Sequence, residues 1–298
     1  MRIQTIAALT DFSTRAECAL DRAAALAARH RASLVLVYAS DEPHPGFTNP
    51  QARLEQRSRQ LARRHEIKVS TRDFDEAGGV AGRALLAAAV ADLLVIDRRD
   101  QPSWMRPWRG GVLSHCLRRS PCPVLVVQQP VLEREDQPAG YARMLVAVDG
   151  SRRSHDILRF AADLHSGAQV DLFQPDGGRP QELQALERYR DELQQGADEQ
   201  RRLRIKGVHH ARRNRVDSHT GARDVTRQLM VQQQRSHADL VAIGAPRNGW
   251  LDRWALGVRG ARLASLVSCD VLVCGQLPQE RKDTESPDLR GGRPQLRF

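Results

Sequence analysis

The chain has 298 residues, of which 41% are hydrophobic and 28% are charged, a length that accommodates one large domain or two medium ones. It contains no run of 18 apolar residues, which argues against a transmembrane helix, and Asp11 interrupts the first apolar run before a signal-peptide core is complete. We therefore expect a cytoplasmic protein without a membrane segment.

The net charge of +10 raises the question of a nucleic-acid partner. Almost all basic residues are arginine, and they are spread along the chain without a stripe, so we interpret the basicity as incidental. The five cysteines form no C-x-x-C pair and lie in apolar surroundings, which favours small buried side chains over disulfides or zinc ligands. We therefore expect neither nucleic-acid binding nor a metal site.

In the first half of the chain, short apolar runs alternate with segments that have helical periodicity. Ser13 stands where an N-cap belongs, just before the first of these helices. The pattern predicts strands over 3–9, 33–39, 67–74, 91–96 and 123–127, and helices over 13–30, 51–66, 80–90 and 111–119.

The second half repeats this order. The pattern predicts strands over 144–149, 169–174, 205–211, 240–244 and 271–275, and helices over 151–167, 180–203 and 223–237, with one more before the last strand. Strands of four to seven residues that alternate with helices indicate a parallel sheet covered on both faces.

The two halves also share motifs at a nearly constant spacing. ALTDFS recurs as VAVDGS, with Asp11 and Asp149 separated by 138 residues (149 − 11), and CPVLVV recurs as CDVLVC with a separation of 147 (269 − 122). Repeats in one order at one spacing predict two domains of about 140 residues. We place them at residues 1–128 and 141–276, joined by a polar linker over 128–140 and followed by a polar tail over 277–298 that we expect to be disordered.

These motifs resemble the universal stress protein family, in its tandem two-domain form. The features that carry the resemblance are the strand ending in Asp-Gly-Ser, the ADL run that precedes a loop, and the final helix leading into CPVLVV. The resemblance implies an α/β fold in which each domain has a five-stranded parallel sheet, like that of the nucleotide-binding adenine alpha hydrolases and other Rossmann-like proteins. Because domains of this family pair through their last strands, it also implies an internal pseudo-dimer, and it allows a homodimer.

The ATP-binding branch of this family carries G-x2-G-x9-G-[ST] after the fourth strand. Glycines there leave backbone N–H groups free to point at phosphate oxygens, and the last glycine opens a helix whose N-terminus favours an anion. In the first half the matching positions are Asp97, Asp100, Gly110 and Gly111. Two carboxylates at phosphate positions disfavour an anion, so we interpret the first loop as a degenerate site.

The second half keeps more of the pattern. Its early glycine survives and an arginine replaces the next one, although the hydroxyl is again missing; a shifted alignment over 244–249 keeps a glycine-rich turn. The resemblance further implies that Val35 and Val37 of the first half flank a base. The candidate residues are Asp149, Gly244, Arg247, Gly257 and Val258 in the second domain, and Asp11 and Gly110 in the degenerate first site.

All four tryptophans fall in the two loops that follow the fourth strand of each half: Trp104, Trp108, Trp250 and Trp254. They could present an aromatic surface to a base or a partner. A spacing of four within a helical turn favours packing instead, with each pair holding its loop against the sheet edge or against the other domain.

The interpretation we favour is a non-enzymatic stress-response protein that acts by binding. The alternative is a regulator that binds ATP in the second domain and hydrolyses it weakly, so ATP is the one cofactor implied. An enzyme of the wider nucleotide-binding group is disfavoured because the sequence contains no P-loop and no nucleophile elbow, and GGVAG at 78–82 lacks the spacing of a dinucleotide fingerprint.

Overall fold

The computed structural model of the chain describes residues 3–40, 49–74, 79–98, 112–128, 130, 140–148, 152–165, 167–174, 204–210, 221–244, 263–264 and 266–275. The helix expected over 180–203, most of the expected linker, the 277–298 tail and all four tryptophans lie outside these residues.

The elements follow the predicted order. The first half contains β1 (Thr5–Thr10), α1 (Thr14–His30), β2 (Ser33–Tyr38), α2 (Pro50–His65), β3 (Val69–Arg72), α3 (Gly79–Ala89), β4 (Leu93–Asp97), α4 (Val112–Arg119) and β5 (Val124–Val127). The second half contains β6 (Arg143–Ala147), α5 (Arg152–Leu164), β7 (Gln169–Gln174), β8 (Arg204–His210), α7 (Gly221–Ser236), β9 (Leu240–Gly244) and β10 (Asp270–Cys274).

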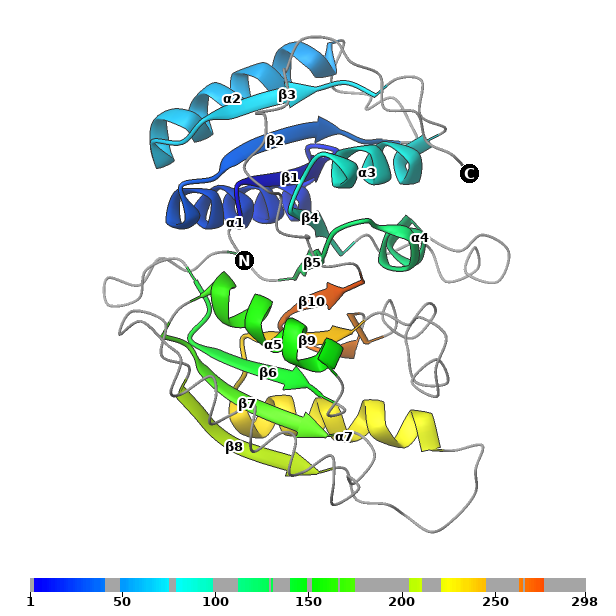
Figure 1. The fold of residues 1–298 in the computed structure, drawn as a ribbon. Coiled ribbons are helices and arrows are strands. Elements are labelled where there is room, and N and C mark those ends of the chain that lie inside the picture. Colours follow the sequence, from blue (N-terminus) through cyan, green and yellow to red (C-terminus); the bar gives the residue numbers. More distant parts are fainter. Residues whose placement is uncertain are drawn as a thin grey trace.

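The strands form one ten-stranded sheet in the order β3-β2-β1-β4-β5-β10-β9-β6-β7-β8. Each half is parallel and repeats the same order, so the predicted fold of two tandem α/β domains is confirmed. The halves meet where β5 and β10 pair antiparallel, with Leu125 opposite Leu272 (Figure 1). We call this strand pair, together with the side chains around it, the seam.

Helices cover both faces of the sheet. One hydrophobic cluster packs α1, α2 and α5 against one face, and a second cluster packs α3, α4 and α7 against the other (Figure 1). Successive residues of a strand therefore alternate between two buried faces: Ala8 lies in the first cluster and Ala7 in the second. Strands buried on both faces need apolar residues at consecutive positions, which explains the apolar runs in the sequence.

The helix boundaries follow from local chemistry. Ser13 is the N-cap of α1, as predicted, and its hydroxyl accepts a hydrogen bond from the backbone N–H of Ala16. Asn49 caps α2 in the same way and is followed by Pro50, whose missing N–H costs nothing in the first turn. No helix among the described residues is long and apolar enough to cross a bilayer.

The repeated ADL motif has a structural role. The Asp92 carboxylate accepts hydrogen bonds from the backbone N–H groups of Gln4 and Thr5, both at 2.9 Å, at the start of β1. Asp239 does the same for Ala142 and Arg143 at the start of β6. Each aspartate therefore fixes the start of its domain's first strand, which accounts for the recurrence of the motif.

Candidate functional site

The order β2-β1-β4 places a switch point between β1 and β4, and the repeat places another between β6 and β9. In open α/β sheets, ligands bind outside the carboxyl ends of the strands at such points. In the first domain, this position is occupied by Asp11 and Phe12 after β1 and by Asp97 and Arg98 at the end of β4.

The turn after β1 has a left-handed backbone at Phe12, with φ of 63°. Its N–H donates to the Thr10 hydroxyl at 2.9 Å, and the N–H of Ser13 donates to the Asp11 carboxylate at 2.9 Å. Glycine adopts positive φ at little cost, whereas a residue with a side chain is strained there. An Asp-Gly-Ser sequence, which the second half contains, would carry no strain in a turn of this shape, while Asp-Phe-Ser needs support from tertiary contacts.

That support is an aromatic stack. The Phe12 ring lies on Tyr38, with ring centroids 5.2 Å apart and planes 24° apart. The guanidinium of Arg53 lies 4.9 Å from the ring centroid of Phe12, so Phe12 is covered by α2 and by the end of β2. Phe12 and Tyr38 thus fill the space beside Asp11, a residue of the predicted degenerate first site.

Asp97 is not a loop residue, contrary to its expected place in a phosphate loop. It is the last residue of β4, pairs in register with Val127 of β5 and is only 3% exposed. The strand continues beyond the expected 91–96 because the N–H of Arg98 still donates to the Val127 carbonyl. Asp100, Gly110 and Gly111 lie outside the described residues, so the loop itself is not observed.

Val35 and Val37, the expected base-flanking residues, are both buried in the cluster beneath α3. Strand register identifies the equivalent positions of the second domain. Thr5 pairs with Ser33 in the first domain, and its equivalent Arg143 pairs with Gln169 in the second. Val35 and Val37 therefore correspond to Asp171 and Phe173 of β7. The Asp171 carboxylate lies 3.3 Å from His209 Nε2 on β8. Sequence reasoning missed this pair, which becomes visible only once strand register is known.

Gly244 ends β9, and its role is at least partly one of packing. A Cβ added there would lie 2.9 Å from Ile157 Cδ1 of α5. In the first domain, Asp97 corresponds to Gly244 and Ala19 corresponds to Ile157, so the larger residue on the strand faces a smaller one on the helix. Asp149, Arg247, Gly257 and Val258 lie outside the described residues, so the structure does not test the site they were predicted to form.

A pocket of about 200 Å³ lies beside the seam, at the carboxyl ends of β4 and β5 and against α1. The described residues that line it are Arg15, Cys18, Arg98, Val127 and Gln128. Burial and the nearby Asp21 carboxylate raise the pKa of the Cys18 thiol, which keeps it protonated at neutral pH. The described part of the chain contains no group of three or more metal-ligating side chains.

The comparisons with known proteins agree with this architecture. The model of the universal stress protein family matches residues 2–128 and 140–275. A universal stress protein from Archaeoglobus fulgidus has a TM-score of 0.63 with 14% identity, covering 92% of this chain and 96% of its own. A universal stress protein from Pseudomonas aeruginosa has a TM-score of 0.58 with 19% identity, covering 92% and 93%.

A third structure is that of a universal stress protein in complex with cAMP. It is 23% identical over 43% of this chain and 98% of its own, with a TM-score of 0.36. No curated protein is significantly similar to the chain.

The fold is thus a tandem pair of Rossmann-like α/β domains with a switch point in each. Because the family model matches both halves and nearly the whole described chain, the protein belongs to the universal stress protein family.

Proposed function

We propose that this chain is a non-enzymatic stress-response protein that acts by binding. Its first domain, residues 1–128, has a degenerate nucleotide site, and its second, residues 141–276, has an altered adenine-nucleotide site. The observation that carries the proposal is the stack of Phe12 on Tyr38 under Arg53. These side chains bury one another beside Asp11, and a base would have to displace them.

The second domain lacks such a residue at the corresponding turn, where the sequence reads Asp-Gly-Ser. Gly244 ends β9 without a side chain, and Arg247 follows it in the sequence. The Asp171 carboxylate stands at the position equivalent to Val35, one of the residues that flank a base in the resemblance, and lies 3.3 Å from His209 Nε2 on β8. Together these features support ATP as the ligand of the second domain, in a site that includes Asp149, Gly257 and Val258.

We further propose that the two domains act as an internal pseudo-dimer. The antiparallel pairing of β5 with β10 supports this, because it joins the two parallel sheets and leaves neither strand as an exposed edge.

Calorimetric titration of ATP into the full chain tests the assignment of the site. We expect wild type and Asp11→Asn to bind alike, and Gly244→Asp to bind at least about tenfold more weakly because of charge repulsion. Gly244→Ala is the matched control, since it adds the same Cβ against Ile157 without a charge.

Loss of binding in Asp11→Asn together with retention in Gly244→Asp would place the site in the first domain. An absence of binding at millimolar ATP would refute the site in the second domain and leave a protein that acts without a nucleotide. Sustained phosphate release from bound ATP would favour the weakly hydrolysing regulator.

A further inference from the structure

One side of the seam holds a buried polar cluster. Arg22 Nε of α1 lies 3.2 Å from the Asp270 carboxylate at the start of β10, and these side chains are 9% and 1% exposed. The Tyr141 hydroxyl donates to the same carboxylate at 2.8 Å, and the backbone N–H of Gln128 donates to its other oxygen at 2.8 Å. The cluster therefore joins residues of the first domain to residues of the second.

The charged and polar groups of the cluster also stabilise one another electrostatically. The Arg22 guanidinium lies 4.8 Å from the centroid of the Tyr141 ring, in a cation–π arrangement. Complete burial and the Asp270 carboxylate raise the pKa of Tyr141 well above its usual value, so its hydroxyl remains a donor. The Gln128 side chain adds a hydrogen bond of 2.7 Å to the Cys269 carbonyl.

On the repeat-related side of the seam, the described residues form no such cluster. With the separations of 138 and 147 residues found in the sequence, Arg22 corresponds to Phe160, Tyr141 to Ile3, and Asp270 to Pro123. All three equivalents are buried and apolar. The seam is thus polar on one side and apolar on the other, although the two domains share one fold.

We propose that this asymmetry makes the seam selective for a first domain paired with a second domain. Two first domains would bury two Arg22 side chains without a carboxylate, and two second domains would bury two Asp270 side chains without a cation. A buried charge without its partner is strongly unfavourable, so like pairs are rejected. The partner that fits this surface is the complementary half, in the same chain or in a second copy of it.

The proposal rests on the internal pairing proposed above and is independent of nucleotide binding. It is tested on the full chain with Arg22→Met and with the double variant Arg22→Met/Asp270→Ala. The control is Arg59→Met/Glu55→Ala, which removes an exposed pair on α2 whose atoms are 4.0 Å apart. Melting temperature and sedimentation velocity at increasing protein concentration are the measurements.

We expect Arg22→Met to lower the melting temperature by about 5 °C or more, because it leaves the Asp270 carboxylate buried without its cation. The double variant should recover part of this loss, because it removes the buried charge but leaves the Tyr141 hydroxyl and the Gln128 N–H without their acceptor. It should also form larger species absent from wild type and control, since an apolar seam allows like domains of different chains to pair.

A melting temperature of Arg22→Met equal to that of wild type would overturn the proposal, as would a folded double variant that associates no more than wild type. If the double variant does not fold, Arg22→Met alone still decides. In this variant, a pair of first domains no longer buries an unpaired cation, so the variant should self-associate more than the control. Unchanged association would contradict the proposal. None of these measurements uses ATP, so a failed titration leaves their outcome intact.

Discussion

Phe12 shows how one residue can hold an unfavourable backbone conformation. Its φ of 63° costs on the order of 1–3 kcal/mol for a residue with a side chain. The burial of its ring against Tyr38 offsets this cost, since a fully buried aromatic side chain contributes roughly 1.5–3 kcal/mol. Strain and packing at this position are therefore separable by substitution.

We expect Phe12→Ala to destabilise the protein by about 3 kcal/mol, because it removes the ring and keeps the strain. Phe12→Gly should be more stable than Phe12→Ala by about 1 kcal/mol, since glycine tolerates positive φ. Urea denaturation of the two variants gives the comparison. At an ordinary helical or strand position, glycine is less stable than alanine. If Phe12→Gly were less stable than Phe12→Ala, the turn would have to leave its positive φ once the ring is removed.

Gly244 and Ile157 form a second residue pair that can be tested. A Cβ at position 244 would meet Ile157 Cδ1 at 2.9 Å, so Gly244→Ala should cost about 1–2 kcal/mol of unfolding free energy. In an Ile157→Ala background, which copies the Ala19 of the first domain, the cost should fall by about 1 kcal/mol. A double-mutant cycle by chemical denaturation measures this coupling, and an additive result would show that the two side chains do not interact.

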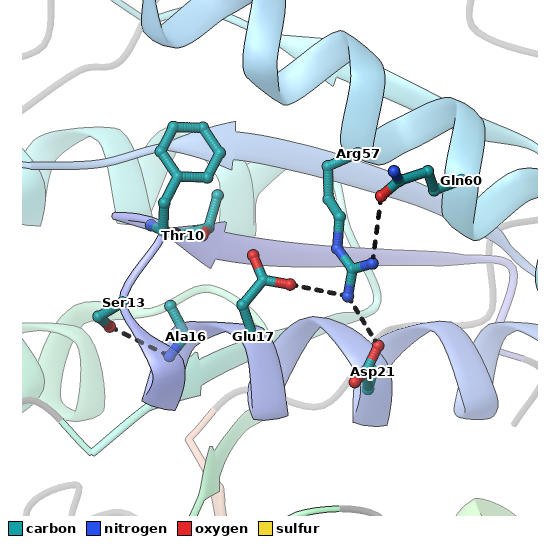
Figure 2. A network of polar contacts seen from close by, with 8 residues as sticks. Thr10, Ser13, Ala16, Glu17, Asp21, Arg57 and Gln60 are labelled. Atoms are coloured by element: carbon teal, nitrogen blue, oxygen red, sulfur yellow. Dashed lines mark hydrogen bonds and ion pairs between the residues drawn. The ribbon is translucent and has the colours of Figure 1, made fainter. Parts of the chain in front are cut away.

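At the scale of elements, α1 and α2 are joined by one arginine. Arg57 Nη2 of α2 lies 2.7 Å from the Glu17 carboxylate and 2.9 Å from that of Asp21, both on α1 (Figure 2). A second nitrogen of the guanidinium, Nη1, reaches Gln60 at 3.5 Å. Glu17 and Asp21 stand four residues apart on one face of α1, which lets a single guanidinium contact both.

Arg57→Ala should destabilise the chain by about 1 kcal/mol, because the side chains are partly exposed and solvent weakens the pairs. The loss should shrink in 1 M salt, which screens charges at these distances. Arg59→Ala is the control, and it should change stability by less than about 0.5 kcal/mol because its pair with Glu55 is exposed. Equal effects of the two substitutions would show that the bridge between the helices adds nothing.

At the scale of the whole molecule, one histidine joins the two domains and a second lies close to it, near the ends of α1 and α5. His30 Nε2 donates to the Leu164 carbonyl at 3.1 Å, and His165 Nδ1 donates to the Tyr141 carbonyl. Burial lowers the pKa of both imidazoles, and the nearby Arg29 lowers both further. The hydrogen bonds to the carbonyls act in the opposite direction, as does Asp163 on His30.

The lowered pKa values of these two histidines determine how the stability of the folded protein changes with pH. In the unfolded chain the imidazoles have a pKa of about 6.5, and in the folded protein they have a lower one. Between the two values the unfolded chain binds more protons, so stability falls as pH falls from about 7. We expect the melting temperature to decrease from pH 7 to pH 5, with a shallower slope in His30→Gln/His165→Gln. An unchanged slope, relative to a His155→Gln control, would contradict this origin.

The sequence alone determined the class of fold, because the features that define it are local. Apolar runs set the strands, periodicity set the helices, and Ser13 marked the start of α1. The recurrence of these features at fixed separations gave the two tandem domains. The site residues predicted in the second domain, among them Asp149 and Arg247, remain predictions, because they lie outside the described residues.

Tertiary structure alone decided which distant residues meet. Arg22 and Asp270 are 248 positions apart (270 − 22), and no local pattern marks either of them as a partner across the seam. The stack of Phe12 on Tyr38 and the contact of Gly244 with Ile157 likewise depend on strand register and helix packing. Periodicity records which face of an element is buried, but the identity of the neighbour on that face is fixed only when the elements pack together.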